Sequence, residues 1–198
     1  KKLLSILLFC LLVFLLTGCG EKPAASEFIP QGENEEYLLY QNHEKGFSFT
    51  MPANWEYKES EKADQISFLS PKESADDPFQ ENFYAGAGTT RNPFKKKMTQ
   101  QEVYDQLIEK AEADKGNLEG FAFMGYEYVA LANDKALRLT FSGKSEEAGG
   151  LTITFTQWYL SKGAANYMCQ YTAQTESYDT FLPVIEAALE SFQCTAGE

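Results

Sequence analysis

Four cysteines and a single histidine are the side chains of this sequence best suited to nucleophilic or metal chemistry. A Ser-His-Asp or Cys-His arrangement would have to be built around His43, and no nucleophile motif lies beside that residue. We therefore interpret His43 as a loop residue. One histidine excludes a histidine-rich metal site, and Asp76-Asp77 and Glu146-Glu147 lack the spacing of a calcium loop. The sequence thus predicts no catalytic residue, no metal site and no cofactor.

Residues 1–18 have the pattern of an export signal. Lys1 and Lys2 precede an apolar run from Leu3 to Leu16, which is short for a membrane-spanning helix of about 20 residues. The run ends in Thr17-Gly18-Cys19, which resembles the box that lipoprotein-processing enzymes recognise. The resemblance implies that the Cys19 thiol receives a diacylglyceryl group and becomes the first residue after cleavage. We expect a lipid anchor on the extracytoplasmic face of a membrane, with an ordinary cleaved signal or an uncleaved anchor as the alternative.

Charge and composition define the rest of the chain. Residues 19–36 are polar and acidic, contain proline and glycine, and predict a flexible tether behind the lipidated cysteine. Residues 37–194 suit one domain with a proper core, and residues 195–198 are expected to be a short tail. The 17 Lys and Arg residues against 29 Asp and Glu residues give a net charge of −12, which argues against nucleic-acid binding.

Two cysteines remain once Cys10 leaves with the signal and Cys19 carries lipid. Cys169 and Cys194 would then lie in a compartment where disulfides persist. The strand that follows Cys169 runs about 20 Å, and the terminal helix returns about 18–20 Å. We predict a disulfide between Cys169 and Cys194, with a buried free thiol and a frayed terminal thiol as the alternative.

A basic cluster stands out in this acidic chain. Arg91, Lys95, Lys96 and Lys97 fall in the loop before the first predicted helix. One interpretation is a solvated loop. The functional hypothesis is a contact for an anionic partner, such as a cell-wall polymer, a lipid headgroup or an acidic protein surface.

Aromatic residues are also frequent in the predicted strands. Most are expected to fill the core beneath a helix, but several exposed together would indicate a ligand groove. These aromatic residues are Trp55, Trp158, Tyr159, Tyr167 and Tyr171.

Hydrophobic periodicity predicts mostly strands. Within Leu151–Leu160, apolar residues alternate with threonines, a pattern typical of a sheet buried on one face. Thr99 and Glu102 form a capping-box pattern for a helix that we expect to end near Gly116. A second amphipathic helix is expected from about Thr180 to Phe192, with Pro183 in its first turn. The predicted strands are 37–42, 47–51, 66–69, 83–89, 121–131, 136–143, 151–160 and 167–173.

The resulting order ββββαββββα predicts the α+β class, an antiparallel sheet flanked by helices. Within it, Gly46 to Trp55 (GFSFTMPANW) is similar to the opening strand of PsbP-like domains, where an aromatic strand ends in proline followed by tryptophan. The motifs Phe181-Leu182-Pro183 and Leu189-Glu190-Ser191-Phe192 resemble the final helix of that family. The resemblance implies an antiparallel sheet between helices and the role of a non-catalytic extrinsic subunit or a bacterial lipoprotein. It assigns no functional residue.

Together these features predict a non-catalytic binding or accessory module for an unidentified protein or envelope component. A binder of a small apolar or sugar ligand is the first alternative. A hydrolase is the second, because glycoside hydrolysis needs only two suitably placed carboxylates.

Overall fold

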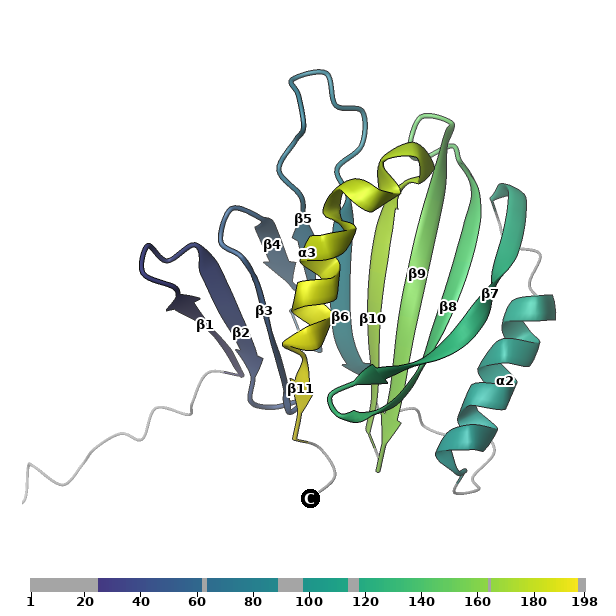
Figure 1. Ribbon diagram of the computed structural model, residues 1–198, viewed down its shortest axis with the longest axis horizontal. Coiled ribbons are helices and arrows are strands. Elements are labelled where there is room, and N and C mark those ends of the chain that lie inside the picture. Colours follow the sequence, from purple (N-terminus) through teal and green to yellow (C-terminus); the bar gives the residue numbers. More distant parts are fainter. Residues whose placement is uncertain (1–24, 62–63, 89–97, 114–117, 164, 196–198) are drawn as a thin grey trace, which may run out of the picture.

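The computed structural model describes residues 25–61, 64–88, 98–113, 118–163 and 165–195, and its strands form two antiparallel sheets (Figure 1). The four-stranded sheet has the order β1-β2-β3-β11 and the seven-stranded sheet the order β4-β5-β6-β10-β9-β8-β7. The strands are β1 (Ser26–Gln31), β2 (Tyr37–Asn42), β3 (Phe47–Pro52), β4 (Glu56–Glu59), β5 (Gln65–Leu69), β6 (Asn82–Gly88), β7 (Glu119–Leu131), β8 (Asp134–Ser145), β9 (Leu151–Lys162), β10 (Ala165–Gln174) and β11 (Gln193–Cys194).

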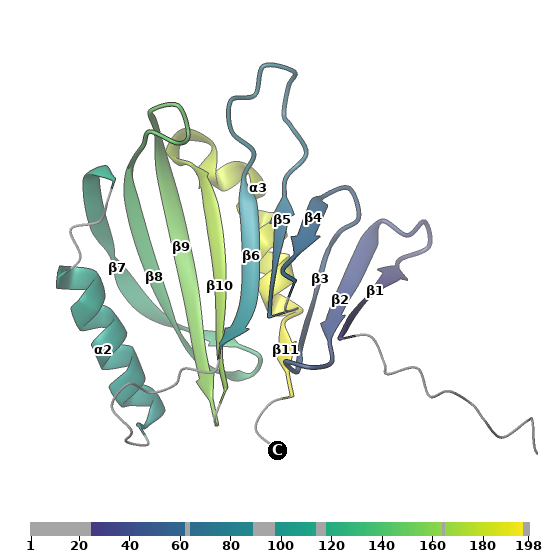
Figure 2. The same cartoon turned by 180° about the vertical axis from the view of Figure 1, so that it is seen from behind.

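Two α-helices pack on opposite faces of the seven-stranded sheet. Helix α2 (Gln100–Ala113) contacts β7, β8 and β9, whereas α3 (Tyr178–Glu190) contacts β3 and β10 (Figures 1 and 2). A short 3₁₀ turn, η1 (Thr175–Ser177), precedes α3. The predicted α+β class with antiparallel strands and two helices is confirmed. No helix among the described residues has both the length and the apolar character needed to cross a membrane.

The main core lies between the two sheets and beneath α3. Alternation in β3 turns Phe47, Phe49 and Met51 inward, and each of these side chains is at most 2% exposed. Phe49 meets Phe83 of the seven-stranded sheet at a ring-centroid distance of 5.4 Å, and it meets Phe192 beyond α3 at 6.2 Å. Aromatic contacts therefore join both sheets and the C-terminal segment into one core.

A second core lies beneath α2. Its fully or nearly buried members are Tyr104, Ala111, Leu137, Leu139 and Phe141. The predicted capping box starts the helix: the Thr99 N–H donates to Glu102 Oε2 at 2.8 Å, and the Glu102 N–H donates to Thr99 Oγ1 at 3.2 Å. Only Tyr104 and Ala111 of α2 are buried, so the helix contacts the sheet along a narrow strip of its surface. Its main contacts are with β7, β8 and β9.

Three short strands were not predicted. Strand β1 lies within the expected tether and pairs along its whole length with β2, so the segment 19–36 is not a tether throughout. Strands β4 and β11 complete the two sheets at positions where four residues or fewer give little periodic signal. Helix α3 also begins at Tyr178, earlier than expected, which places Pro183 beyond the first turn. The carbonyl that Pro183 leaves without a helical N–H belongs to Asp179, which is exposed to water.

Candidate functional site

One face of the seven-stranded sheet is only half covered. The four-stranded sheet and α3 pack on the opposite face, and α2 covers β7, β8 and β9. Figure 2 shows β6 and β10 on the α2 side with no described helix over them. Strand pairing aligns Tyr159, Met168, Gly86 and Gln65 in one row across this face. We name the α2 side of β5, β6, β10 and β9 the open face.

A hollow of about 340 Å³ lies where the open face meets α2. Val103 and Leu107 of α2 form one wall, and Tyr84, Tyr159 and Met168 rise from the strands. Asp64, Gln65, Ser161 and Asn166 supply polar groups at its margin. The hollow has the size and mixed lining of a small-ligand site, which is typically 300–1,000 Å³ and mostly apolar with a few polar groups.

Glycine shapes the floor of this hollow. A Cβ atom at Gly86 would stand 2.6 Å from the Tyr84 hydroxyl oxygen and 3.1 Å from the ring carbon that bears it. Since a Cβ points away from the sheet plane, the Tyr84 ring must lie along the sheet surface over Gly86. The Tyr84 hydroxyl donates to Gln65 Oε1 at 2.9 Å, which fixes the ring in this position. Any larger residue at position 86 would displace it.

Hydrogen bonds also fix the α2 wall. The buried Tyr104 donates its hydroxyl to the Lys135 carbonyl oxygen at 2.7 Å and accepts from the Ser161 N–H at 3.3 Å. Gln100 Nε2 donates to the Ser161 carbonyl oxygen at 2.9 Å. Burial raises the pKa of Tyr104, and it raises the pKa of Tyr159 to about 12. Both phenols are therefore neutral at physiological pH and act as hydrogen-bonding groups.

A second hollow of about 620 Å³ lies at the far end of the open face. It is enclosed by the loop between β5 and β6 and by the loop between β8 and β9, and its lining includes Phe79, Asn82, Ile153 and Thr172. Side chains between the two hollows are joined by hydrogen bonds. Tyr159 donates to Gln157 Oε1 at 2.8 Å, Gln157 Nε2 donates to Gln170 Oε1 at 2.8 Å, and Gln170 Nε2 contacts Thr172 Oγ1 at 3.1 Å. We name these four residues the amide ladder.

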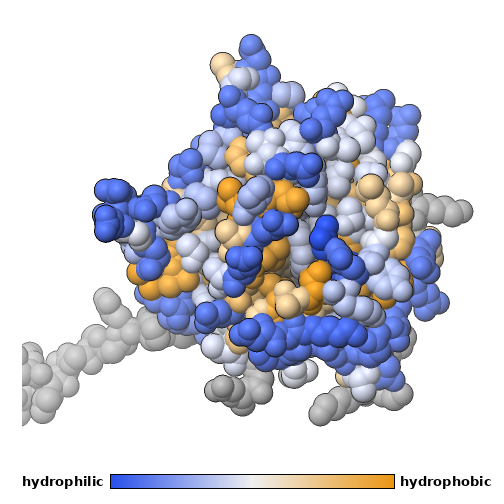
Figure 3. All heavy atoms as spheres, in the orientation of Figure 1, coloured by the Kyte–Doolittle hydropathy of each residue, from blue (hydrophilic) through white to orange (hydrophobic). Residues whose placement is uncertain are grey.

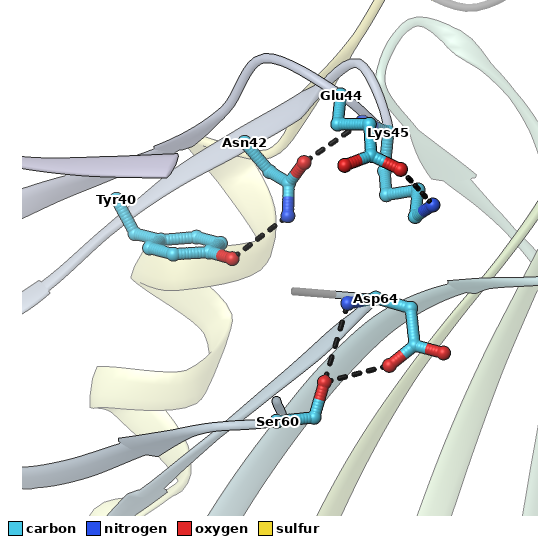
Figure 4. Close-up of polar contacts among 6 residues, drawn as sticks. All are labelled: Tyr40, Asn42, Glu44, Lys45, Ser60 and Asp64. Carbon is cyan, nitrogen blue, oxygen red and sulfur yellow. Dashed lines mark hydrogen bonds and ion pairs between the residues drawn. The ribbon is translucent and has the colours of Figure 1, made fainter. Parts of the chain in front are cut away.

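A separate polar cluster joins the two sheets near the first hollow (Figure 4). Tyr40 donates its hydroxyl to Glu59 Oε1 at 2.5 Å and accepts from Asn42 Nδ2 at 2.9 Å. Burial, with the neighbouring Glu59 carboxylate, raises the pKa of Tyr40. Ser60, which follows β4, donates its Oγ hydroxyl to Asp64 Oδ1 at 2.6 Å. This bond fixes the Asp64 carboxylate at the margin of the first hollow, and the Tyr40–Glu59 bond links the two sheets.

The predicted functional residues are not brought together. Cys19 and the basic cluster of Arg91, Lys95, Lys96 and Lys97 lie outside the described residues. His43 follows β2, and its Nε2 atom lies 2.8 Å from Glu27 Oε1 on the exposed surface. Among the described residues, no three His, Cys, Asp or Glu side chains are grouped as a metal site would require. Of the aromatic residues, Trp55, Trp158, Tyr167 and Tyr171 are buried, whereas Tyr159 lines the first hollow.

The predicted disulfide between Cys169 and Cys194 is not formed, because both thiols are free in the structure. Helix α3 does return toward the start of β10, but the chain then enters β11 and pairs with β3, placing Cys194 opposite Phe47 of the other sheet. Cys169 is fully buried in β10, between Ala85 and Trp158 on the neighbouring strands. Burial raises the pKa of the Cys169 thiol and makes it unreactive.

Sequence reasoning missed most residues of the hollow. Tyr84 and Met168 fall within predicted strands and Tyr104 within the predicted helix, and nothing in the local sequence marks them as lining residues. A signal was present in β9 and β10, where glutamines replace apolar residues at alternate positions facing the α2 side. An inward row that contains amides indicates a face that is not fully packed.

Known proteins share the sequence pattern and the fold of this chain. The family model described as PsbP-like protein matches residues 3–194. This chain belongs to the PsbP-like protein family. The comparison with curated proteins found no match.

Solved structures with the same fold have low sequence identity to this PsbP-like protein. LpqN of Mycobacterium tuberculosis, described as involved in cell envelope biogenesis, is 17% identical with a TM-score of 0.54, covering 80% of this chain and 90% of LpqN. Cyanobacterial PsbP (CyanoP) from Synechocystis sp. PCC 6803 is 12% identical with a TM-score of 0.53, covering 91% and 99%. PA94 from Pseudomonas aeruginosa, described as a putative regulator, is 16% identical with a TM-score of 0.51, covering 79% and 95%. At these identities the likeness supports the fold alone.

Proposed function

We propose that this PsbP-like protein is held by lipid on Cys19 at the extracytoplasmic face of a membrane and serves there as a non-catalytic binding module. The anchor is supported by the export pattern and by Thr17-Gly18-Cys19. The family match begins at residue 3 and so includes this segment. Fully extended, the chain from Cys19 to the first residue of β1, Ser26, spans at most about 25 Å. The domain would therefore stand close to the membrane surface.

The observation that carries the binding role is the first hollow on the open face. It is concave, it has tyrosines on its floor, and its α2 wall is fixed by hydrogen bonds that need no ligand. Preformed sites of this kind bind with a small ordering cost. The described lining holds one carboxylate, Asp64, whereas a carboxylate-based hydrolase needs two. A ligand of the envelope is consistent with the role in cell envelope biogenesis stated for LpqN.

The size of the first hollow favours a second candidate function, the binding of a small apolar or sugar ligand. The two functions differ in the partner. A protein partner would cover the open face broadly, whereas a small ligand would occupy the hollow.

Lipidation is tested by feeding labelled palmitate to cells that make the full chain. The wild-type protein and a Cys10→Ser variant are expected to incorporate label, because Cys10 lies within the proposed signal. A Cys19→Ser variant is expected to incorporate none. Equal labelling of all three proteins would refute the anchor.

Binding at the open face is tested by in-cell photo-crosslinking. A photoreactive amino acid at Met168 on the open face should give a discrete crosslinked product. The matched control is Thr152 on β9, an exposed residue whose side chain points to the opposite face of the same sheet. Equal products from the two positions would show that the open face has no special role.

A further inference from the structure

The strands of the open face place no charged side chain on it, and the carboxylates of Asp64 and Glu147 lie in flanking segments that line the two hollows. Alternation along β5, β6, β10 and β9 places only apolar, aromatic, amide and hydroxyl residues on it, and its central row reads Ser67, Tyr84, Gln170 and Gln157. This occurs in a chain of which 23% of the residues are charged. An ionic ligand buried here would find no counter-charge on the floor and would lose its hydration without compensation. The floor is therefore suited to a neutral ligand.

The amide ladder excludes a purely apolar ligand. Gln157 uses one N–H and its carbonyl oxygen within the ladder, and Gln170 does the same. An amide offers two donors and two acceptor sites, so each glutamine keeps an N–H and a lone pair for a further partner. An apolar ligand would remove water from these groups and leave them unsatisfied. The ligand must therefore supply both donors and acceptors, as hydroxyl groups do.

The aromatic floor adds a stacking surface. The Tyr84 ring lies along the sheet over Gly86, so one face of the ring is presented outward. Tyr159 lies on the neighbouring row and lines the same hollow. An aromatic face favours contact with the C–H face of a ring that carries hydroxyls at its edge. Flat stacking beside amide hydrogen bonds is the chemistry that recognises a sugar ring.

We propose that the open face is a binding groove for a neutral oligosaccharide, which stacks on Tyr84 and hydrogen-bonds to the amide ladder. The two hollows lie near opposite ends of β10, and the stretch of the open face between them, from Asn166 to Thr172, spans roughly 20 Å. This length accommodates several sugar units. The inference rests on the proposed binding function and names its ligand class.

The test is calorimetric titration of the purified full chain in detergent with a panel of neutral hexasaccharides, namely chitohexaose, maltohexaose, cellohexaose and mannohexaose. Hexagalacturonic acid serves as the charged comparison. At least one neutral hexasaccharide should bind with unit stoichiometry, more tightly than its disaccharide and more tightly than the charged comparison. Tyr84→Ala and Gln170→Ala should each weaken binding about tenfold.

Two control variants distinguish a specific loss of binding from a loss of the folded structure. Tyr84→Phe retains the stacking ring and loses only the bond to Gln65 that fixes it, so it should bind more tightly than Tyr84→Ala. Tyr37→Ala removes a tyrosine that is 46% exposed on the other sheet and should bind unchanged. Binding to no neutral hexasaccharide, tighter binding to the charged comparison, or equal binding by Tyr84→Ala would overturn the inference. If the Met168 crosslink persists in that case, the binding module stands and only its ligand class is wrong.

Discussion

Truncation of Phe49 gives the sharpest test of the fold, because this side chain connects both sheets and the C-terminal segment. The Phe49 ring is 0% exposed, and its centroid lies 5.7 Å from Phe68, 5.4 Å from Phe83 and 6.2 Å from Phe192. A buried Phe→Ala change costs about 3–5 kcal/mol, through lost transfer free energy and the cavity it leaves. With aromatic neighbours on three sides, we expect Phe49→Ala to fall in the upper part of that range, about 4–5 kcal/mol. This is a large share of a typical free energy of unfolding of about 5–15 kcal/mol.

The measurement is urea unfolding of the purified protein followed by tryptophan fluorescence. Trp55 lies beyond β3 against Phe181, and Trp158 lies on β9, so the two buried reporters sample both sides of the core. At an m-value of about 2 kcal/mol/M, the midpoint should fall by roughly 2 M. The exposed Tyr37→Ala variant should change stability by about 0.5 kcal/mol or less. A loss below about 1.5 kcal/mol for Phe49→Ala, or two separate transitions in the wild type, would refute a shared core.

Three further predictions concern titration, thiols and charge. Burial raises the Tyr159 pKa from 10.0 to about 12, so between these pH values the native state keeps a phenolic proton that the unfolded state loses. The free energy of unfolding should therefore fall as pH rises from about 10 to 12, and it should fall more in the wild type than in Tyr159→Phe. In the unreduced native protein a thiol reagent should modify the half-buried Cys194 before Cys169, and both thiols should react after denaturation; protection of both in the denatured state would instead reveal a disulfide. If the basic cluster binds an anionic surface, replacing Lys95–Lys97 with glutamate should weaken envelope association and flatten its salt dependence. Unchanged association would indicate that the cluster is only a solvated loop.

Local patterns predicted the elements with strong periodicity. The alternation of Phe47, Phe49 and Met51 and the capping pair Thr99 and Glu102 each act within a few residues, and both were confirmed. Strand β1 was missed because SEFIPQ contains an acid and Pro30 and has little apolar surface. An edge strand tolerates proline, because one side of its ladder needs no N–H donor. It is held by contacts that local patterns do not reveal, namely its pairing with β2 and the stacking of Phe28 on Tyr57 with ring centroids 4.1 Å apart.

The candidate site depends on long-range packing and could not be predicted from local patterns. The open face exists because α2 packs over β7 to β9 and leaves β6 and β10 uncovered, and no residue of α2 encodes that choice locally. The disulfide was predicted from strand and helix lengths, which gave the direction of α3 correctly. Those lengths contained no information about β11, and its pairing with β3 moves Cys194 onto the other sheet.

The position of β11 has a consequence for the order in which the molecule is built. The first three strands of the four-stranded sheet belong to the start of the chain, whereas the fourth is made almost last. The Thr50 N–H donates to Ser191 Oγ at 2.9 Å across 141 positions of sequence. Contacts between residues so far apart in sequence form late and slowly, because the loop between them must close first. The nascent chain therefore cannot complete its four-stranded sheet until Gln193 and Cys194 have been synthesised, and this late closure would suit a chain that is exported before folding, as proposed above.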